Sequence, residues 1–578
     1  MRIFGSFFST LREWIKTNQH TITSGLTSWD NSQKSIYMRL TIVAAAFGFF
    51  FTTVSYRVLS VALSHHAEKK GYFAKNVSRR EIVDRNNNLL AVNIPASSVF
   101  ANPQHMIDIE KDITKLAKAV PGIDKNKLIS ELKKDGKTFV WVKRDLTPKE
   151  QQTIHDLGIA GLYFENEERR LYTYGTVASH ILGHVGRDGK GLAGIEKNFD
   201  DFLNHDNHDE TGEDTPLQLT LDIRVQNIVS QELDKVIAEF NATGGVGIVA
   251  DPNTGEILAL VSKPDFDPHN PSKANDEQLF NRASLGIYEL GSIMKCITLA
   301  VGFDSKTITL HDAYNLSNFR VGKFQVKDYH KEEGWHSVAD VFLNSSNIGS
   351  TQIALEIGQE KFRSYYKKLG LLDQVKLDIP ERGYPLFQKT SDWSDITLTT
   401  MSYGYGVSIS PLHFVQAMIP VVNGGYMHKL KLVKKTDDGA ETSEKVLDES
   451  TSDAMRKLLR LVVSKGTGKK AEVAGYFVGG KTGTANKREG KGYVNNNRMS
   501  SFFGTMPSIN PKYVVLVMLD EPKPSKNSFG FATAGWNAAP ATGAILSRIA
   551  ALYGMRPYDT NLEVEEQLEV DYQIDSET

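Results

Sequence analysis

The sequence predicts an α+β protein, a sandwich in which a mainly antiparallel sheet is flanked by helices. Strand-like and helix-like segments follow one another after residue 215 without the regular strand–helix–strand alternation of a parallel sheet. The turn-rich DPNTGE at 251–256 separates two apolar runs, which is typical of a hairpin. A mixed α/β region precedes this domain, and an apolar segment lies near the N-terminus.

The large domain is expected to contain a strand, a helix, a hairpin, a buried strand and a closing helix, in that order. Alternating or continuous apolar character marks the strands, and helical periodicity marks the helices. The segments are a strand at 217–221, a helix at 225–240, hairpin strands at 244–250 and 257–262, a strand at 513–519 and a helix at 541–553. They define a domain from residue 215 to residue 556.

An uncharged segment near the N-terminus predicts a membrane anchor. No residue from Leu40 to Tyr56 is charged, and apolar residues recur as far as Leu63. The first 39 residues carry five Lys and Arg against two acids, so the positive-inside rule keeps them in the cytoplasm and sends the rest across the membrane. We therefore expect one transmembrane anchor at 40–60. A cleaved signal peptide and a buried core helix are the alternatives, although a leader of 39 residues is long for a signal peptide.

Composition sets the remaining boundaries. Residues 61–214 are mixed and polar and end in the acidic linker NHDNHDETGED. Residues 557–578 contain eight acids and no Lys or Arg, which predicts a disordered, solvated tail. The formal net charge of −2 offers no basic excess for nucleic acid. With a single cysteine, Cys296, and no zinc-type Cys/His spacing, we predict no intrachain disulfide, metal or cofactor.

Three short motifs occur in order within the large domain. They are Ser292-Ile-Met-Lys295, Ser345-Ser-Asn347 and Lys481-Thr482-Gly483-Thr484. The first two patterns are weak alone, because S-x-x-K recurs at 130–133 and 364–367 and S-x-N recurs at 508–510 and 525–527. K-T-G occurs once. The ordered set is typical of serine acyltransferases that act on D-Ala-D-Ala-like substrates and β-lactams.

The spacing of the first motif explains its expected chemistry. A serine hydroxyl is a poor nucleophile until a base takes its proton. Residues three apart share one face of a helix, so Lys295 is expected beside Ser292. Burial and a second cation such as Lys481 would lower the pKa of Lys295 and let it act as the base. Gly291 permits a tight entry into the helix, whose N-terminus adds positive potential.

The second and third motifs are expected to complete the site. Ser345 can relay a proton to a leaving amine, and Asn347 can hold a peptide amide. The third motif is expected to be an edge strand along the cleft, in which Gly483 lets substrate approach the backbone. The amides of Ser292 and Thr484 can form an oxyanion hole. The residues suited to a substrate carboxylate are Lys481, Thr482 and Thr484.

Each motif also has a purely structural interpretation. Ser292 can be a helix N-cap, 345–347 a turn, and 481–484 the end of a strand. Lys295 can be an ordinary solvated lysine, although its neighbours are apolar. All of these interpretations must hold together for the ordered set to be accidental, so the set favours the enzyme.

The chain resembles the class B penicillin-binding proteins, and within them the septal, division-type enzymes called FtsI. The resemblance covers about residues 39 to 551 and rests on long blocks in a fixed order. In the first half these are SRREIVDRNNNLLA at 78–91, ERRLYTYG at 168–175 and ASHILGHVGRDGKGLAGIEKNFD at 178–200. In the large domain they include NRASLGIYELGSIMK at 281–295, VGKFQVKDYH at 321–330, NSSNIGS at 344–350, SYGYGVSISPLHFVQAM at 402–418 and GGKTGTANK at 479–487.

The resemblance implies a transpeptidase domain at 215–556 on a non-catalytic, dimerisation-type pedestal at 61–214. It implies that the enzyme cross-links peptidoglycan stem peptides at the division septum and that β-lactams trap it. The implied roles are Ser292 as the acylated serine, Lys295 as its general base, Ser345 and Asn347 as the second motif, and Lys481, Thr482, Gly483 and Thr484 as the third. A single-pass inner-membrane protein with a periplasmic catalytic domain is implied. The implied partners are the membrane, a septal glycosyltransferase of the FtsW type and other divisome proteins.

Three other functions stay open at this point. An elongation-type class B transpeptidase has the same chemistry with other partners. A serine β-lactamase or D,D-carboxypeptidase rarely needs a long N-terminal pedestal, and no convincing glutamate motif for a deacylating water is present. A catalytically silent penicillin sensor is disfavoured because Ser292, Lys295 and Lys481 are intact.

Overall fold

The computed structural model describes residues 43–58, 79–204, 215–388, 393–434, 443–489, 492–558 and 566–570. The chain forms two compact units, Met1–Asn76 and Val77–Thr578. In the first unit residues 43–58 form a helix. No helix in the part of the chain that the structure describes is both long and apolar enough to span a membrane. The predicted cytoplasmic segment 1–39 and residues 40–42 and 59–60 of the predicted anchor lie outside the described residues.

A five-stranded sheet, which we call the pedestal sheet, forms the first half of the second unit. Its long strand β2, Leu89–Ala101, pairs antiparallel with β4, Leu162–Tyr172, along one edge. Along its other edge β2 pairs antiparallel with β3, Val140–Leu146, and with β1, Ile82–Val83. The strand β5, Leu217–Gln218, joins β1 in parallel. Because β5 opens the large domain, this sheet ties the two halves of the unit together.

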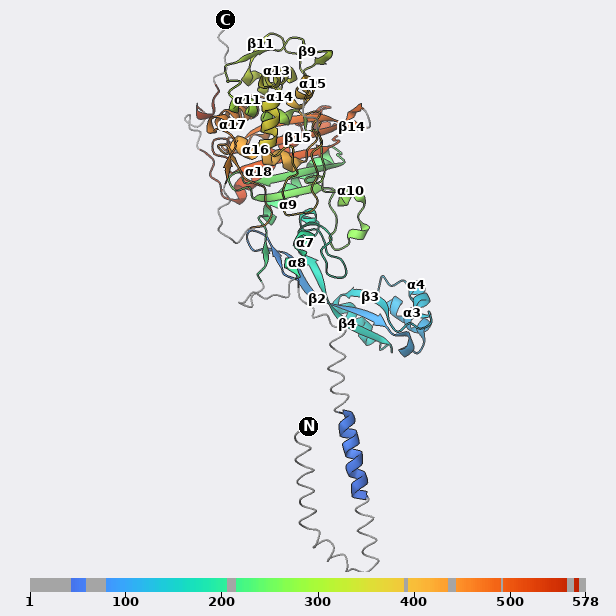
Figure 1. The fold of residues 1–578 in the computed structure, drawn as a ribbon. Coiled ribbons are helices and arrows are strands. Elements are labelled where there is room, and N and C mark those ends of the chain that lie inside the picture. Colours follow the sequence, from blue (N-terminus) through green and yellow to red (C-terminus); the bar gives the residue numbers. More distant parts are fainter. Residues whose placement is uncertain are drawn as a thin grey trace, which may run out of the picture. The chain divides into compact units, whose positions relative to one another are not determined.

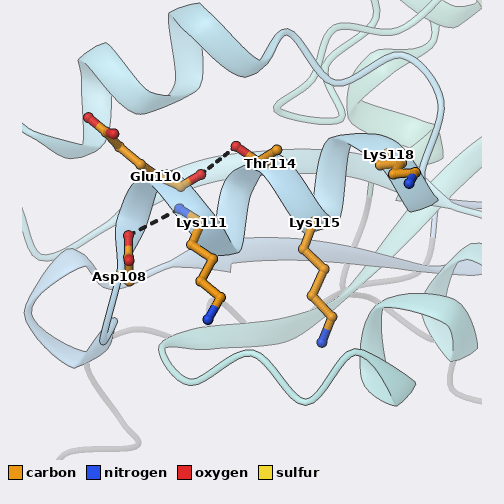
Figure 2. A pocket seen from close by; sticks show the side chains of 6 residues that line it. All are labelled: Asp108, Glu110, Lys111, Thr114, Lys115 and Lys118. Atoms are coloured by element: carbon orange, nitrogen blue, oxygen red, sulfur yellow. Dashed lines mark hydrogen bonds between the residues drawn. The ribbon is translucent and has the colours of Figure 1, made fainter.

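Three capped helices pack with the pedestal sheet. They are α3, Ile109–Ala119, α4, Lys125–Leu132, and α5, Pro148–Asp156, and they begin at the side-chain caps Asp108, Asp124 and Thr147. Their apolar residues form one cluster with β2 and β3. A pocket on α3 is lined by charged and polar side chains, and no residue of the three motifs lines it (Figure 2). Its lining residues are Asp108, Glu110, Lys111, Thr114, Lys115 and Lys118.

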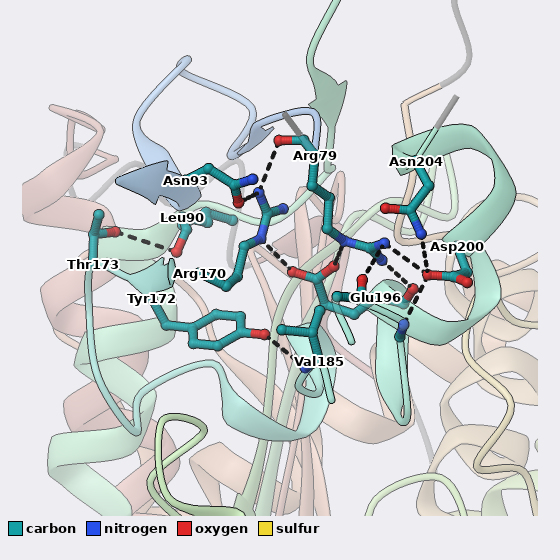
Figure 3. Close-up of polar contacts among 12 residues, drawn as sticks. Arg79, Leu90, Asn93, Arg170, Tyr172, Thr173, Val185, Glu196, Asp200 and Asn204 are labelled. Atoms are coloured by element: carbon teal, nitrogen blue, oxygen red, sulfur yellow. Dashed lines mark hydrogen bonds and ion pairs between the residues drawn. The ribbon is translucent and has the colours of Figure 1, made fainter. Parts of the chain in front are cut away.

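Three short helices follow the sheet: α6, Ser179–Leu182, α7, Gly194–Asn198, and α8, Asp200–Leu203. A largely buried cluster of charges connects residues 79 and 170 with α7 and α8 (Figure 3). We call Arg79, Arg170, Glu196 and Asp200 the neck cluster. Glu196 receives Arg79 Nε at 2.6 Å and Arg170 Nε at 2.8 Å, one on each carboxylate oxygen. Arg79 also reaches Asp200 at 2.7 Å. Two cations and two anions therefore neutralise one another inside the protein.

Side chains of the pedestal also fix the first helix of the large domain. The carboxylate of Asp84 lies at the start of helix α9, Ile223–Glu239, where its Oδ2 accepts from Ile223 N at 3.1 Å. Its N-cap Asp222 accepts from Asn86 Nδ2 at 3.0 Å. Asp84 and Asn86 belong to the block at 78–91, so this block has a structural task at the domain junction.

The large domain is built on a second five-stranded sheet, antiparallel throughout (Figure 1). In sheet order its strands are β14, Gly479–Glu489, β15, Gly492–Met506, β16, Tyr513–Asp520, β6, Gly244–Ala250, and β7, Ile257–Lys263. The predicted hairpin is β6–β7, and the predicted buried strand is β16 in the middle of the sheet. The α+β class is confirmed.

Both faces of this sheet are covered by helices, which explains the continuous apolar run of β16. Val515 and Val517 pack with α9 and α18, Ala538–Leu552, in one cluster. Leu516 and Met518 belong to the opposite cluster, with α11, Lys295–Asp304, α16, Pro411–Val422, and α17, Glu449–Ser464. Successive strand residues point to opposite faces, so a strand with two buried faces has no polar side.

The remaining elements of the large domain are short helices and hairpins. They are α10 Asp276–Leu279, α12 Val338–Leu343, α13 Asn347–Ile357, α14 Gln359–Lys368, α15 Asp395–Ser402, β8 Ala313–Asn315, β9 Phe319–Val321, β10 Phe324–Val326, β11 Trp335–Ser337, β12 Tyr426–Met427 and β13 Glu444–Lys445. The single 3-10 turns of the large domain are η2 Pro271–Lys273, η3 Gly291–Met294, η4 Lys469–Ala471 and η5 Lys526–Ser528, and η1, Pro103–His105, lies in the pedestal.

The described part of the C-terminal tail differs from the composition-based expectation of a solvated chain. Within residues 566–570, Leu568 and Val570 are buried, and Val570 joins the main apolar cluster of the large domain. Two apolar side chains at alternate positions outweigh the local acidity here, because their burial is worth about 1.5–3 kcal/mol each. Residues 559–565 and 571–578 of the tail, and the linker 205–214, lie outside the described residues.

Candidate active site

The first motif lies where the short helix η3 leads into the buried helix α11. Gly291 opens the turn with φ of +61°, and a Cβ there would lie 2.8 Å from Thr484 O on β14. The N–H of Gly291 donates to Gly404 O at 3.2 Å. A Cβ on Gly404 would lie 2.1 Å from Gly291 O. Two glycines therefore let the turn that carries Ser292 fit between β14 and residue 404.

Ser292 does not act as a helix cap in this turn. The N-cap positions of η3 and α11 are Leu290 and Met294, and neither makes a side-chain capping bond. The Ser292 hydroxyl instead lies 3.1 Å from Lys295 Nζ. The N-cap interpretation of Ser292 is therefore wrong.

Lys295 is fully buried, and four oxygens lie within hydrogen-bond distance of its Nζ. Ser292 Oγ lies at 3.1 Å, Ser345 Oγ at 3.1 Å, Ser345 O at 2.5 Å and Asn347 Oδ1 at 2.8 Å. Neither carbonyl-type oxygen, on Ser345 or Asn347, can donate a proton, so both accept N–H groups. A neutral amine has two N–H groups and one lone pair. With those two groups engaged, the lone pair is available to a hydroxyl proton.

The second motif forms the turn between α12 and α13. Ser345 adopts φ of +59°, the left-handed region that is costly for a residue with a Cβ. This conformation presents both its carbonyl and its hydroxyl to Lys295. Ser346 then caps α13 by accepting from Gly349 N at 3.0 Å. The solvated-lysine interpretation is therefore wrong, whereas residues 345–347 do form a turn, and this turn places two oxygens of Ser345 against Lys295.

The third motif lies on β14, which is the edge strand of the large sheet, as expected. A Cβ on Gly483 would lie 2.9 Å from Ile293 Cγ2 and 3.0 Å from Leu290 O. Gly483 is therefore needed for the close packing of η3 on β14, in addition to the substrate approach expected from the sequence. Thr482 Oγ1 lies 2.7 Å from Thr467 Oγ1, in the loop after α17.

The three motifs meet at one hydroxyl. Lys481 Nζ donates to Ser345 Oγ at 2.9 Å, and Lys295 Nζ lies 3.1 Å from the same oxygen. Ser345 thus connects the lysine of the first motif with the lysine of the third. Residues that are 189 positions apart in the chain (292 and 481) are linked through two side chains.

The electrostatics of the site are set by two buried cationic groups. Neither lysine contacts a carboxylate among the described residues. Burial, followed by the neighbouring charge of Lys481, holds the pKa of Lys295 well below its ordinary value. Burial lowers the pKa of Lys481 to about 8. The arrangement therefore favours loss of the proton from the Lys295 amine, while the neighbouring Lys481 amine stays within hydrogen-bond distance of Ser345.

This arrangement has the parts of a nucleophilic acyl transfer. A buried amine whose pKa is lowered lies beside the Ser292 hydroxyl, and the Ser345 hydroxyl connects this amine to the amine of Lys481. Such a set can accept a proton from Ser292 and pass a proton onward through Ser345. Cys296 points into the same core, and burial raises the pKa of its thiol to about 12, so it stays a neutral thiol.

Three neighbours of the motifs carried no role in the sequence-based prediction. Asp328 accepts hydrogen bonds from Ser346 and from the start of α13. Gly404 and Thr467 touch the first and third motifs. Asp328 and Gly404 lie in the blocks at 321–330 and 402–418, so their membership in those blocks was the available signal. Thr467 lies outside the quoted blocks.

The other S-x-x-K sequences lie on the surface. Ser130 donates to Lys127 O within α4, and Lys133 is exposed in an ion pair with Glu110. Ser364 and Lys367 are exposed on α14. Within the described ranges, no group of three or more His, Cys, Asp or Glu side chains is arranged to hold a metal ion.

Comparison with known proteins gives two family matches on this chain. The family described as penicillin binding protein transpeptidase domain matches residues 245–544. The family described as penicillin-binding protein dimerisation domain matches residues 74–213. The first match covers the helices and strands that carry all three motifs.

Curated relatives match over most of the chain. It is 37% identical to the probable peptidoglycan D,D-transpeptidase FtsI of Caulobacter vibrioides, over 90% of this chain and 89% of that protein. It is 30% identical to the probable peptidoglycan D,D-transpeptidase PenA of Neisseria gonorrhoeae, over 82% of this chain and 85% of that protein. The fold is similar to penicillin binding protein 3 of Mycobacterium tuberculosis, solved with aztreonam, with a TM-score of 0.66, 23% identity and coverage of 84% and 98%.

Proposed function

Because the chain belongs to the penicillin-binding protein transpeptidases, we propose that it is a peptidoglycan D,D-transpeptidase whose acyl-enzyme forms on Ser292. The observation that carries the proposal is the buried Lys295, which lies 3.1 Å from Ser292 Oγ and bonds no carboxylate among the described residues. Such an amine is a base already paired with its nucleophile.

The reaction is an acyl transfer in two steps. As Ser292 Oγ attacks the carbonyl carbon of the D-Ala–D-Ala bond, its proton passes to neutral Lys295. The C–N bond breaks, and D-Ala leaves as an amine with a proton relayed through Ser345. An amine of a neighbouring stem peptide then attacks the ester and gives up a proton to Lys295. Ser292 Oγ takes a proton back as the C–O bond breaks.

The other motif residues hold the donor peptide in this proposal. Asn347 binds its amide, and the amides of Ser292 and Thr484 form the oxyanion hole, where each donor is worth about 3–4 kcal/mol. Lys481, Thr482 and Thr484 bind the terminal carboxylate. The hydrogen bond between Thr482 and Thr467 supports a fixed rotamer of the Thr482 side chain at this carboxylate site.

Mass spectrometry of the full-length protein in detergent tests the reaction centre. After exposure to a penicillin, we expect one adduct, on the peptide that contains Ser292. The Ser292→Ala variant should carry none, and Ser130→Ala, which alters the surface S-x-x-K, should carry the normal adduct. An adduct at another residue, or its persistence in Ser292→Ala, overturns the proposal. Rapid loss of the adduct would favour a β-lactamase instead.

The cellular role proposed is septal cross-linking, supported by the identity with the FtsI relative. Depletion of the protein should give filamentous cells. Round cells would indicate the elongation-type alternative. A glycosyltransferase of the FtsW type should co-purify with the full-length chain, and its absence after cross-linking would remove that partner.

The topology proposed is a single-pass inner-membrane protein with a cytoplasmic N-terminus. The uncharged run from Leu40 to Tyr56 and the basic residues before it support this. The proposed segments are a cytoplasmic 1–39, an anchor at 40–60, a pedestal at 61–214, a periplasmic transpeptidase domain at 215–556 and a tail at 557–578. Alkaline washing should leave the protein in the membrane fraction, and protease added to spheroplasts should digest the catalytic domain. Resistance of that domain would reverse the orientation.

A further inference from the structure

Asp328, in the loop between β10 and β11, binds the start of the helix that follows Ser345. Its Oδ2 accepts from Ser346 Oγ at 2.7 Å. Its Oδ1 accepts from the backbone N–H of Asn347 and, at 3.0 Å, from that of Ile348. One carboxylate therefore takes three donors at a helix N-terminus, where a negative charge is most favourable.

The Asp328 loop also holds the side chain of Asn347. The carbonyl of Lys327 accepts from Asn347 Nδ2 at 2.8 Å. This bond assigns Oδ1 as the acceptor of Asn347, and Oδ1 is the atom that faces Lys295 Nζ at 2.8 Å. The loop thus decides which end of the amide meets the lysine.

The turn before these residues is strained and needs support on both sides. Ser345 has φ of +59°, which costs about 1–3 kcal/mol for a residue other than glycine. Two bonds connect it back to α12: Ser345 N donates to Phe342 O at 3.3 Å, and Ser346 N donates to Val341 O at 2.9 Å. Toward α13, the fixing contacts are those made by Asp328 and the bond that Ser346 Oγ accepts from Gly349 N at 3.0 Å. Without them the turn can relax and withdraw its two oxygens from Lys295.

The charge of Asp328 also acts on Lys295. Burial and Lys481 lower the pKa of Lys295, and Asp328 is the group that opposes them. The groups around Lys295 are Ser292 and Cys296 from its own helix and turn, Ser345 and Asn347 from the α12–α13 turn, and Lys481 from β14. Cys296 is a neutral thiol, so the charges that act on Lys295 are those of Lys481 and Asp328.

We propose that Asp328 is a positioning residue for the Ser292–Lys295 pair: it holds the Ser345 turn and the Asn347 amide in place, and it supplies a negative charge that acts on Lys295. The proposal rests on the proposed function of Ser292 and adds a residue outside the three motifs. Asp328 acts through Ser346 and Asn347 and touches neither reacting atom.

The test is the pH dependence of the acylation rate of the full-length protein by a fluorescent penicillin. Asp328→Asn removes the charge but keeps the shape and one acceptor, so two effects are expected. The maximal rate falls about tenfold to a hundredfold, because the catalytic groups are displaced. The acid limb moves to lower pH, because Lys295 without a nearby anion loses its proton more easily. From the plateau to the acid limb, the ratio of variant to wild-type rates should rise at least about threefold.

Two further variants separate this role from general structural support. Asp328→Glu keeps the charge, so its acid limb should stay near that of the wild type even if its rate falls. Asp340 is an acid at the start of the preceding helix α12, where its carboxylate accepts from the N-cap Ser337 Oγ at 2.7 Å, and it bonds none of the residues named around Lys295. Asp340→Asn should leave the acid limb in place.

The outcomes distinguish this inference from the proposed function. If Asp328→Asn lowers the rate equally at every pH, or leaves it unchanged, the inference is overturned while Ser292 keeps its role. If the wild type itself forms no adduct at Ser292, the proposed function fails and the inference fails with it. A shifted limb in Asp340→Asn as large as in Asp328→Asn also contradicts the inference.

Discussion

The neck cluster and the lysine pair are both buried groups of charges, and they are built in opposite ways. In the neck cluster, Glu196 bonds Arg79 and Arg170 with its two oxygens, and Arg79 also bonds Asp200. Around Ser345, Lys295 and Lys481 share one hydroxyl and bond no carboxylate among the described residues. One group is neutralised by its neighbours, whereas the other is not.

This difference separates a structural use of buried charge from a chemical one. A buried cation with a bonded anion stays charged, and removing its partner leaves an expensive unpaired charge. A buried cation without an anion releases its proton instead, which makes it a base. Burial alone therefore does not identify a catalytic lysine. We propose Lys295 as the base because it has no bonded anion among the described residues and lies 3.1 Å from a hydroxyl.

The largest expected effect comes from replacing Lys295 with methionine, which has a similar length and no charge. Acylation by penicillin should fall about 10²- to 10⁴-fold, the usual contribution of a general base. The unfolding temperature should change little, because removing a buried amine that has no bonded anion offsets the loss of its hydrogen bonds to Ser345 and Asn347. Stopped-flow fluorescence and thermal unfolding measure the two. A fall in both activity and stability would place Lys295 with the structural charges.

The Glu196→Gln substitution tests the other half of the comparison. It should destabilise the second unit by about 3–5 kcal/mol, because Arg79 and Arg170 lose their shared anion. Urea unfolding measures this change, and the acylation rate of the protein that remains folded should be unchanged. Glu110→Gln, which breaks the exposed pair with Lys133, is the matched control and should leave unfolding unaffected. Equal effects of the two would contradict the account.

The pH dependence of stability should differ between wild type and Lys481→Met. The unfolded chain binds a proton at Lys481 up to its ordinary pKa of 10.5, and the folded chain only up to about 8. Between these values the unfolded state binds more protons, so the free energy of unfolding rises with pH. Across this pH window the free energy of unfolding of the wild type should rise by up to about 3 kcal/mol relative to that of Lys481→Met. Urea unfolding at pH 8 and pH 10 measures the gain, and parallel pH profiles would refute it.

A smaller effect is expected from Gly404→Ala, which disturbs the support of the Ser292 turn. The new Cβ would meet Gly291 O. We therefore expect the free energy of unfolding to fall by about 1–3 kcal/mol and acylation to become slower. Gly424 also has φ of +90°, but no atom lies within 4 Å of the place that a Cβ would take there, so Gly424→Ala has the backbone strain alone. Its acylation rate should match the wild type. Equal rates for both variants would show that Gly404 does not support the turn.

The smallest effect is expected from Ser130→Ala in the surface S-x-x-K of α4. Among the described residues its hydroxyl bonds the backbone of its own helix alone, so the free energy of unfolding should change by less than about 0.5 kcal/mol. Acylation should be unchanged within error. A measurable loss of acylation would mean that the motif pattern, without burial, is enough for reactivity.

Much of the fold was predictable because periodicity reports burial. The run at 513–519 is apolar at every position, and it became the central strand β16 with both faces covered. The convergence of residues 292, 345 and 481 was predictable only as an ordered set typical of a family, because no local pattern links positions so far apart.

Other features depend on tertiary contacts that leave no local pattern. In the sequence Asp328 is one of many acidic residues in a loop. Its role becomes visible only in the fold, where it accepts hydrogen bonds at the start of α13. The packing of Gly483 against Ile293 and the clearance at Gly404 depend on how closely two segments approach. The tail residues Leu568 and Val570 lie in an acidic stretch whose average composition hides two buried side chains.

The most direct measurement of the central claim is the acylation rate of Lys295→Arg at neutral pH. Arginine keeps the positive charge and much of the length but does not release its proton in proteins. If Lys295 serves as a neutral base for Ser292, this variant should acylate as slowly as Lys295→Met. If it acylates at a rate near that of the wild type, Lys295 acts only as a cation, and the account of an uncompensated buried amine is wrong.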